Sequence, residues 1–216
     1  MHYDKNWLIN ARANGEAVSF FFFWGHTAKA NEKAGKACFS QWFESPFMVD
    51  GIIYKTAEHW MMAQKALLFN DQAAFDKIIQ CETPAEAKAL GRTVQHYDDA
   101  VWNEKKFALV KAGNLHKFRQ HAEMAAFLLS TGNKVIGEAS PVDAIWGIGL
   151  SENSRKIYDP SQWRGENLPG FALMEVRDYL KAFIQNSQPY VPKQQLFTFF
   201  IAFQYLHPVV QTLVLP

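Results

Sequence analysis

An α+β fold that contains more helix than strand is predicted for this chain of 216 residues. Long segments repeat apolar residues at helical spacing, whereas the strand-like segments are few and short. Thr83-Pro84-Ala85-Glu86 has the pattern of a capping box with proline at the first helical position, and Asp50-Gly51 has that of a hairpin turn. These features indicate one helix-rich domain with a few short strands, over residues 18–185.

The expected strands are short. Residues 19–24, with the sequence Ser-Phe-Phe-Phe-Phe-Trp, are expected to form a buried strand that ends at Gly25. Residues 47–54 are expected to form a hairpin around Asp50-Gly51, and residues 134–139 a further strand. Residues 28–36 are polar, contain glycine and are expected to form a loop.

The expected helices cover most of the remaining sequence. One surrounds Glu58 and ends near Phe69, and the others lie at residues 71–80, 84–91, 98–120, 122–129 and 168–184. The apolar spacing within the two longest helices identifies candidate core positions. These are Trp102, Phe107, Val110, Leu115, Leu173, Val176 and Leu180.

The composition is that of an ordinary globular protein. Hydrophobic residues make up 49% of the chain and charged residues 20%, and the formal net charge is +1. This charge excludes a strong bulk attraction to nucleic acid or to acidic membranes but leaves room for a local basic pocket. The longest apolar run, residues 196–203, is too short to span a bilayer, so no membrane partner is expected.

Cysteine and histidine placement predicts no metal site. Cys38 and Cys81 lie outside any CxxC or Cys/His cluster, and His59 and His116 lack metal-ligand spacing.

Charged residues interrupt the N-terminal region, where a signal peptide would be apolar. Reduced thiols and a cytoplasmic location are therefore expected.

The composition changes from residue 188 onward, where prolines are followed by an aromatic and aliphatic run. Residues 186–216 are interpreted as an apolar C-terminal tail of unknown role. Such a tail either packs on its own domain, forms a contact with a partner or a second copy, or promotes aggregation.

Glu58 lies at the start of an otherwise apolar helix. Helical spacing puts Glu58, Met61, Met62 and Lys65 on one face. Because a buried carboxylate is costly unless it is paired, hydrogen-bonded or used, the pattern indicates a site. The alternative is a surface glutamate favoured by the helix dipole. A general base near neutral pH needs a raised pKa, which Met61 and Met62 would promote and Lys65 would oppose.

A second acidic residue, Asp143, lies in a segment punctuated by proline and glycine. Glycines such as Gly147 and Gly149 allow backbone N–H groups to approach a ligand closely. The alternative is an aspartate that caps a short turn. Paired carboxylates suit glycosyl-bond hydrolysis, in which one activates water or acts as nucleophile and either can stabilise an oxocarbenium-like transition state.

Aromatic and basic side chains supply candidates for binding a flat base and a phosphate. Each tryptophan fits a core role as well as a stacking role, and the candidates are Trp24, Trp42, Trp60, Trp102 and Trp146. Three basic residues could bind phosphate, although most such residues are merely solvated. They are Lys65, Arg92 and Arg177.

Several segments, taken together in order and spacing, resemble the NADAR family of YbiA-like proteins. The matching segments run from about residue 20 to residue 180. They are Phe22-Phe23-Trp24-Gly25, Phe39-Ser40-Gln41-Trp42, Asp50-Gly51 followed by Tyr54 and Thr56-Ala57-Glu58-His59, Met62-Ala63-Gln64-Lys65, Leu90-Gly91-Arg92 with Trp102, Asn114 with Lys117-Phe118, Ser140-Pro141 with Asp143, Trp146-Gly147 and Gly149, and Asn167 with Gly170, Leu173-Met174 and Arg177. The tail has no counterpart in this resemblance.

The resemblance implies an N-glycosidase that hydrolyses the bond between a ribose phosphate or ADP-ribose and a nitrogen. It implies Glu58 as the catalytic glutamate, with Asp143, Trp102 and Trp146 as further functional residues. It implies no metal and no organic cofactor. The expected catalytic residues are therefore Glu58 and Asp143, and the expected substrate-binding residues are Trp24, Gly25, Lys65, Arg92, Trp102, Trp146 and Gly147.

Three functions remain open at this point. The first is hydrolysis of a small ribosylamine phosphate, such as a riboflavin-biosynthesis intermediate, which the charge of +1 favours over a nucleic acid. The second is removal of ADP-ribose from guanine, for which nucleic acid would be a partner. The third is a non-catalytic module that binds ADP-ribose or a nucleotide. The carboxylates Glu58 and Asp143 argue against the third, because a pure binder of an anion does not need them.

Overall fold

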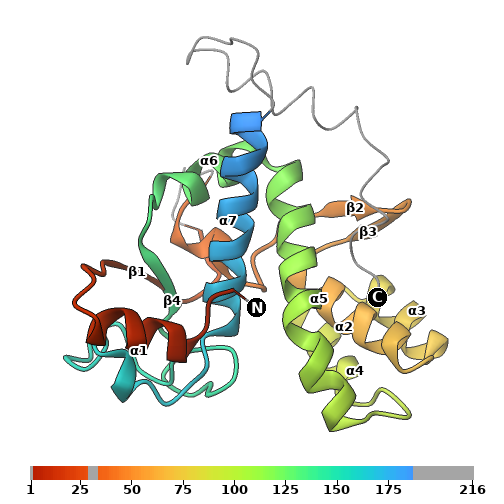
Figure 1. Cartoon of the computed structure of the whole chain (residues 1–216). Helices are drawn as coiled ribbons and strands as arrows, with labels where there is room; N and C mark the ends of the chain where they lie inside the picture. The colour runs from red at the N-terminus through yellow and green to blue at the C-terminus, as the bar shows by residue number, and fades with distance from the viewer. Residues whose placement is uncertain (1, 29–33, 187–216) are drawn as a thin grey trace.

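The structure is a computed structural model that describes residues 2–28 and 34–186. Two long helices form its centre. Helices α5 and α7 stand side by side, with a pair of strands, β1 and β4, on one side and helices α2, α3 and α4 on the other (Figure 1). The helices are α1 (Lys5–Ala13), α2 (Ala57–Leu68), α3 (Gln72–Gln80), α4 (Pro84–Gly91), α5 (Asp99–Gln120), α6 (Ala122–Ser130) and α7 (Leu168–Asn186). The strands are β1 (Phe20–Phe23), β2 (Phe47–Val49), β3 (Ile52–Tyr54) and β4 (Val135–Glu138), and short 3-10 helices lie at Lys36–Phe39 and Pro160–Gln162.

The helix-rich α+β class is confirmed, and every strand and helix expected from the sequence is present within a few residues of its expected bounds. Side chains cap the N-terminus of α4, as the sequence pattern indicates. The Glu86 backbone N–H donates to Thr83 Oγ1 at 3.2 Å, and the Thr83 N–H donates to Glu86 Oε2 at 2.9 Å. Both hairpin residues, Asp50 and Gly51, have the left-handed backbone that a tight turn of this kind requires, with φ of 50° and 80°.

Strands β1 and β4 pair in parallel, in a register that sets Phe20 opposite Val135 and Phe23 opposite Glu138. The pairing continues one step further, because the Ala139 N–H donates to the Phe23 carbonyl at 2.8 Å. The carboxyl ends of parallel strands meet at one edge of a sheet, and ligands of α/β proteins commonly bind there. The segments after Phe23 and after Glu138 therefore begin side by side.

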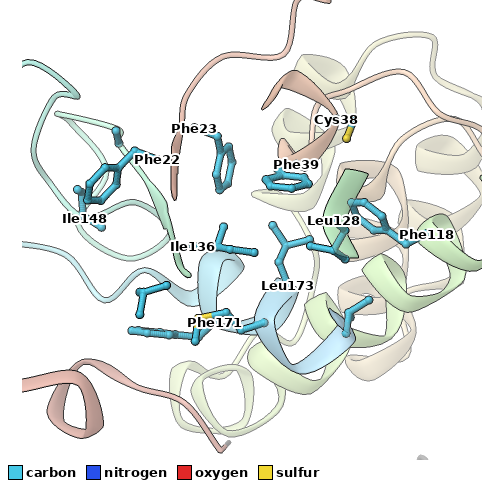
Figure 2. Close-up of a cluster of buried hydrophobic side chains, with 14 of the residues drawn as sticks. Phe22, Phe23, Cys38, Phe39, Phe118, Leu128, Ile136, Ile148, Phe171 and Leu173 are labelled. Atoms are coloured by element: carbon cyan, nitrogen blue, oxygen red, sulfur yellow. The ribbon is translucent and has the colours of Figure 1, made fainter. Parts of the chain in front are cut away.

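The main hydrophobic core lies between this strand pair and the central helices. Phe23 from β1, Phe39 and Phe118 gather on one side of Ile136, and Leu173 of α7 lies on the other (Figure 2). All five side chains are buried completely. The core positions expected in the long helices are confirmed as buried at Trp102, Val110, Leu173, Val176 and Leu180, whereas Phe107 and Leu115 are only partly buried.

A second hydrophobic cluster holds helices α2, α3 and α4 against α5. Trp60 and Met62 of α2 and Trp102 of α5 are among its buried members. Gly91 at the end of α4 is required by this packing, because a Cβ there would lie 2.1 Å from the Met62 sulfur.

Helix α1 lies before residue 18 and is not expected from the sequence. Its start is capped by Asp4, whose Oδ1 accepts from the Trp7 N–H at 2.6 Å. Leu8 is completely buried in the main core. Lys5 Nζ donates to the Trp163 carbonyl at 3.3 Å, and Arg12 donates to the Tyr158 carbonyl. These contacts with residues about 150 positions away stabilise a helix whose own sequence carries a weak apolar pattern.

Two further expectations concern loops and the C-terminal region. The loop expected at residues 28–36 lies in part outside the described residues, and it ends at a 3-10 helix that begins at Lys36. Residues 187–216, which include nearly all of the expected apolar tail, also lie outside the described residues. Among the described residues no helix is long and apolar enough to cross a membrane.

Candidate active site

Glu58 is held at the start of α2 with its carboxylate inside the protein. Thr56 caps the helix, and the Glu58 N–H donates to the Gln41 carbonyl at 2.9 Å. The side chain is only 3% exposed, and Oε1 has no hydrogen-bond partner. The alternative of a surface glutamate is therefore wrong. A buried acceptor without a partner is rare in folded proteins, and a bound molecule is one explanation for it.

Burial raises the pKa of the Glu58 carboxyl to about 7. The positive charge of Lys88 opposes this most strongly, followed by a hydrogen bond from Trp42, and Arg92 has a smaller effect in the same direction. The negative charge of Asp143 raises the pKa further. Lys65 was expected to be the opposing cation, and this is wrong, because Lys88 on α4 takes that place. Glu58 thus changes charge near neutral pH, as a general acid or base must.

Asp143 closes the turn in which it lies. Its Oδ1 accepts from the Ile145 N–H at 2.9 Å and from the Trp146 N–H at 2.7 Å. The capping interpretation is therefore confirmed for one oxygen, while Oδ2 takes no part in this turn. Since its charge acts on Glu58, the structure brings the two expected catalytic carboxylates into one electrostatic group.

Gly147 allows this loop to fold tightly over the end of β4. A Cβ at Gly147 would lie 2.6 Å from the Ser140 Cβ and 3.2 Å from the Glu138 carbonyl oxygen. The Gly147 carbonyl in turn accepts from the Asn167 N–H at 3.2 Å. Glycine at this position thus serves close backbone packing, and its expected contact with substrate stays a prediction.

Glu138, the last residue of β4, joins the group although the sequence did not single it out. Burial raises the pKa of its carboxyl to about 7, and the negative charges of Asp143 and Glu58 raise it further. Lys88 opposes them. The available sequence signal was positional: Glu138 ends a strand directly before the Ser140-Pro141 segment that leads to Asp143.

Trp42 lies against this group of carboxylates and was named from the sequence only as a stacking candidate. It donates a hydrogen bond to the Glu58 carboxylate. The His26 ring lies 5.6 Å from the Trp42 ring, centroid to centroid, and Lys88 Nζ lies 5.7 Å from that centroid. Trp42 is half-buried, so part of its ring faces solvent beside the buried carboxylate.

Trp24 and Gly25 follow β1 and thus begin at the edge of the sheet where Glu138 ends β4. Trp24 is 62% exposed, and Gly25 has a left-handed φ of 82°. A large aromatic side chain that is this exposed next to a charged site is available for stacking on a ligand. Arg92, just after α4, is also exposed.

Lys65 and Trp102 lie together in a different group, on the second hydrophobic cluster. Lys65 Nζ donates to the Gly91 carbonyl at 2.8 Å and lies 4.1 Å from the centre of the Tyr97 ring and 5.5 Å from that of Trp102. Burial lowers the pKa of Lys65. Trp102 is buried, and Trp146 packs at the border of the same cluster. The expected substrate contacts of these three residues stay predictions.

The described residues contain no group of three or more histidine, cysteine, aspartate or glutamate side chains that could hold a metal ion. They also contain no disulfide between Cys38 and Cys81. Glu58 and Glu138, whose raised pKa values are opposed by the positive charge of Lys88, can give and take protons near neutral pH.

Residues 22–181 match the model of the NADAR domain. The chain belongs to the NADAR family. The matched region includes every expected site residue and Glu138. The resemblance inferred from the sequence segments is thereby confirmed.

Relatives in this NADAR family carry names that describe a reaction. N-glycosidase R617 of Acanthamoeba polyphaga mimivirus is 42% identical over 168 residues, which cover 76% of this chain and 97% of the relative. N-glycosidase YbiA of Escherichia coli is 32% identical over 142 residues, which cover 66% of this chain and 80% of the relative. The NMR structure of E. coli YbiA superposes with a TM-score of 0.61 at 26% identity and covers 81% of this chain and 92% of that one.

Proposed function

We propose that this NADAR protein is an N-glycosidase that hydrolyses the bond between C1 of a ribose and a nitrogen. The observation that carries the proposal is Glu58, a buried carboxyl group with a pKa of about 7 and an oxygen, Oε1, that has no hydrogen-bond partner. An ordinary glutamate is fully ionised at neutral pH and cannot exchange protons efficiently there. The names of R617 and YbiA support the same reaction class.

In this mechanism Glu58 accepts a proton from the attacking water, and its negative charge stabilises the cationic, oxocarbenium-like transition state. Asp143 holds a ribose hydroxyl through Oδ2, because Oδ1 is engaged in its own turn. Trp42 keeps the Glu58 carboxylate oriented by its hydrogen bond. Lys88 and Arg92 supply the positive charge for a phosphate group on the ribose.

The first substrate class is a small ribosylamine phosphate, such as an intermediate of riboflavin biosynthesis. The net charge of +1 and the small number of cations at the site support a single phosphate rather than a long polyanion. The protein is then a hydrolase of free metabolites. Ribose 5-phosphate is the expected sugar product.

The second substrate class is ADP-ribose attached to a guanine base. Exposed apolar side chains in the segments after β1 and β4 support it: Trp24 is 62% exposed, and Val142 and Ile145 are 90% and 47% exposed. Apolar side chains beside a charged site suit the flat face of a purine. ADP-ribose is the expected product in that case.

The test is a product assay by mass spectrometry with both substrate classes, offered separately to the wild type and to Glu58→Gln. Glutamine keeps the size of the side chain but cannot accept a proton, so we expect turnover to fall by at least about 100-fold. Glu104→Gln removes a carboxylate from an exposed position on α5 and serves as the control with unchanged turnover.

The products decide between the alternatives. Ribose 5-phosphate released by the wild type alone supports the metabolite hydrolase, and ADP-ribose supports the base hydrolase. Wild-type protein that binds either substrate without cleaving it would show a binding module instead. Full activity of Glu58→Gln would remove the assigned role of that residue.

A further inference from the structure

We propose that Glu138 is a second catalytic carboxyl group of this site, the general acid that protonates the leaving nitrogen. The inference rests on the proposed N-glycosidase function and adds a residue to it. It starts from geometry: Glu138 ends β4 at the edge of the sheet where the segments carrying Trp24 and Asp143 begin.

The backbone of Glu138 is held from both sides. Its N–H donates to Asn167 Oδ1 at 2.9 Å, and its carbonyl accepts from the Ile148 N–H at 2.9 Å and from the Ser140 N–H at 2.8 Å. Asn167 is completely buried and anchors its other amide atom on the Ile136 carbonyl at 2.9 Å. A catalytic group needs such a fixed support, because small displacements cost large factors in rate.

Three charged groups from three other segments act electrostatically on the Glu138 carboxyl. They are Asp143 in the loop after β4, Glu58 at the start of α2 and Lys88 on α4. Two negative charges and one positive charge leave a net field that disfavours a third ionised carboxylate. The pKa of Glu138, about 7, reflects this field together with burial, which is the larger cause. Glu138 therefore carries a proton in a substantial fraction of the molecules at neutral pH.

Glu58 and Glu138 differ slightly in access, and this difference suggests separate roles. Glu58 is almost completely buried, whereas Glu138 is also strongly desolvated but keeps some exposed surface. The more accessible carboxyl group can meet a leaving group that must depart toward solvent. The buried carboxylate is suited to the charge that develops at the sugar carbon.

The proton transfers balance in this arrangement. The electron pair of the C1–N bond moves to the nitrogen, which takes the proton of Glu138. The oxygen of a water molecule forms the new bond to C1, and a proton of that water passes to Glu58. The products are a ribose with a hydroxyl at C1 and a free N–H group. Transfer of a proton from Glu58 to Glu138 through solvent restores the starting state.

The first test is the pH profile of the purified full chain with the substrate that it cleaves. For Glu138→Gln we expect kcat to fall by about 100-fold or more with little change in KM, because the acid acts in the transition state. In the wild type kcat/KM should fall as the pH rises through about 7, since the protonated form of Glu138 is the active one. The variant should lack this alkaline decrease, while Glu104→Gln keeps the wild-type profile.

Glu138→Asp covers the case in which glutamine disturbs the fold. This variant keeps a carboxyl group, so a reduced rate with the alkaline decrease retained supports the acid role. The acid role is overturned if Glu138→Asp keeps the wild-type rate. It is also overturned if the wild-type protein shows no alkaline decrease.

The second test is independent of activity. The carboxyl carbon of Glu138 is titrated by NMR in the wild type and in Glu58→Gln, which removes one of the two negative charges that act on it. We expect the pKa of Glu138 to fall in that variant, and an unchanged value would overturn the shared electrostatic group. Wild-type protein that cleaves no ribosyl substrate defeats the proposed function itself. Cleavage retained by Glu138→Gln defeats only the role of Glu138.

Discussion

Lys117 Nζ on α5 donates a hydrogen bond of 3.0 Å to the carbonyl of Ser40, inside the protein. The next residue, Gln41, accepts the backbone N–H of Glu58 through its own carbonyl, and Trp42 follows. A completely buried cation thus holds the short segment that positions both the backbone of Glu58 and the indole that bonds to its carboxylate. Helix α5 thereby supports the segment that positions Glu58.

The stability of the protein should depend on the charge of Lys117. Burial lowers its pKa to about 8, below the ordinary value of 10.5. The unfolded chain then binds more protons between these two pH values, so the free energy of unfolding should rise as the pH increases from 8 to 10.5. For this residue alone the expected gain is about 3 kcal/mol. Lys117→Met should lack it.

The measurement is urea unfolding of the wild type and Lys117→Met from pH 7 to pH 10. The difference between the two proteins removes the contribution of other titrating groups. Lys117→Met also leaves the Ser40 carbonyl without its donor, which costs about 1–3 kcal/mol at every pH. A difference that stays constant over this range would show that Lys117 has an ordinary pKa.

Glu58 should destabilise the protein at the pH where it works. Its pKa of about 7 in the folded state lies above the ordinary 4.5, so its contribution is favourable below pH 4.5 and is lost as the pH rises through 7. Glu58→Gln should therefore be more stable than the wild type at pH 8, by about 1–3 kcal/mol, and similar to it at pH 4.5. Thermal unfolding at both pH values, with Glu104→Gln as the unchanged control, measures this. A loss of stability in Glu58→Gln at pH 8 would contradict the prediction.

Much of the fold follows from local sequence signals, and the structure shows why. Thr83 and Glu86 bond to each other's backbone, and Asp50-Gly51 adopts the left-handed turn, because these interactions involve neighbours in the chain. Helix α1 had no such strong signal. Its stability comes from contacts with residues near 158 and 163, which no local pattern reveals.

The active site could be predicted only in part for the same reason. Glu58 was identifiable because a carboxylate at the start of an apolar helix is conspicuous along the chain. The cation that opposes its charge was not, since Lys88 comes from a different helix. Glu138 was equally hidden, because its role depends on the parallel pairing of β1 with β4, and nothing in either strand alone specifies that partner.

Gly147→Ala should disturb the loop that carries Asp143. The added methyl group would lie 2.6 Å from the Ser140 Cβ, and the Glu138 and Asp143 carbonyl oxygens lie at 3.2 Å and 3.1 Å. We expect a loss of about 1–3 kcal/mol in unfolding free energy. Turnover should fall as well, because the turn that orients Asp143 must shift.

Ser140→Gly removes the nearest of these atoms and gives a matched test of the cause. The double variant Ser140→Gly, Gly147→Ala should regain part of the lost stability, and the two single variants should not be additive. Additive losses would mean that the packing of Gly147 against Ser140 is not the source of the effect.

Trp42→Phe should shift the pH dependence of the reaction. The hydrogen bond from the indole lowers the pKa of Glu58, so phenylalanine, which keeps an aromatic ring but has no donor, should raise that pKa. If Glu58 must be ionised to act as a base, the acidic decrease of kcat/KM should move to higher pH, and activity at pH 6 should fall more than activity at pH 8. Trp7→Phe on α1 makes the same exchange elsewhere in the chain and should leave the profile in place. An acidic decrease that does not move in Trp42→Phe would show that Trp42 does not set the charge of Glu58. Equal losses at both pH values would then assign Trp42 to substrate binding alone.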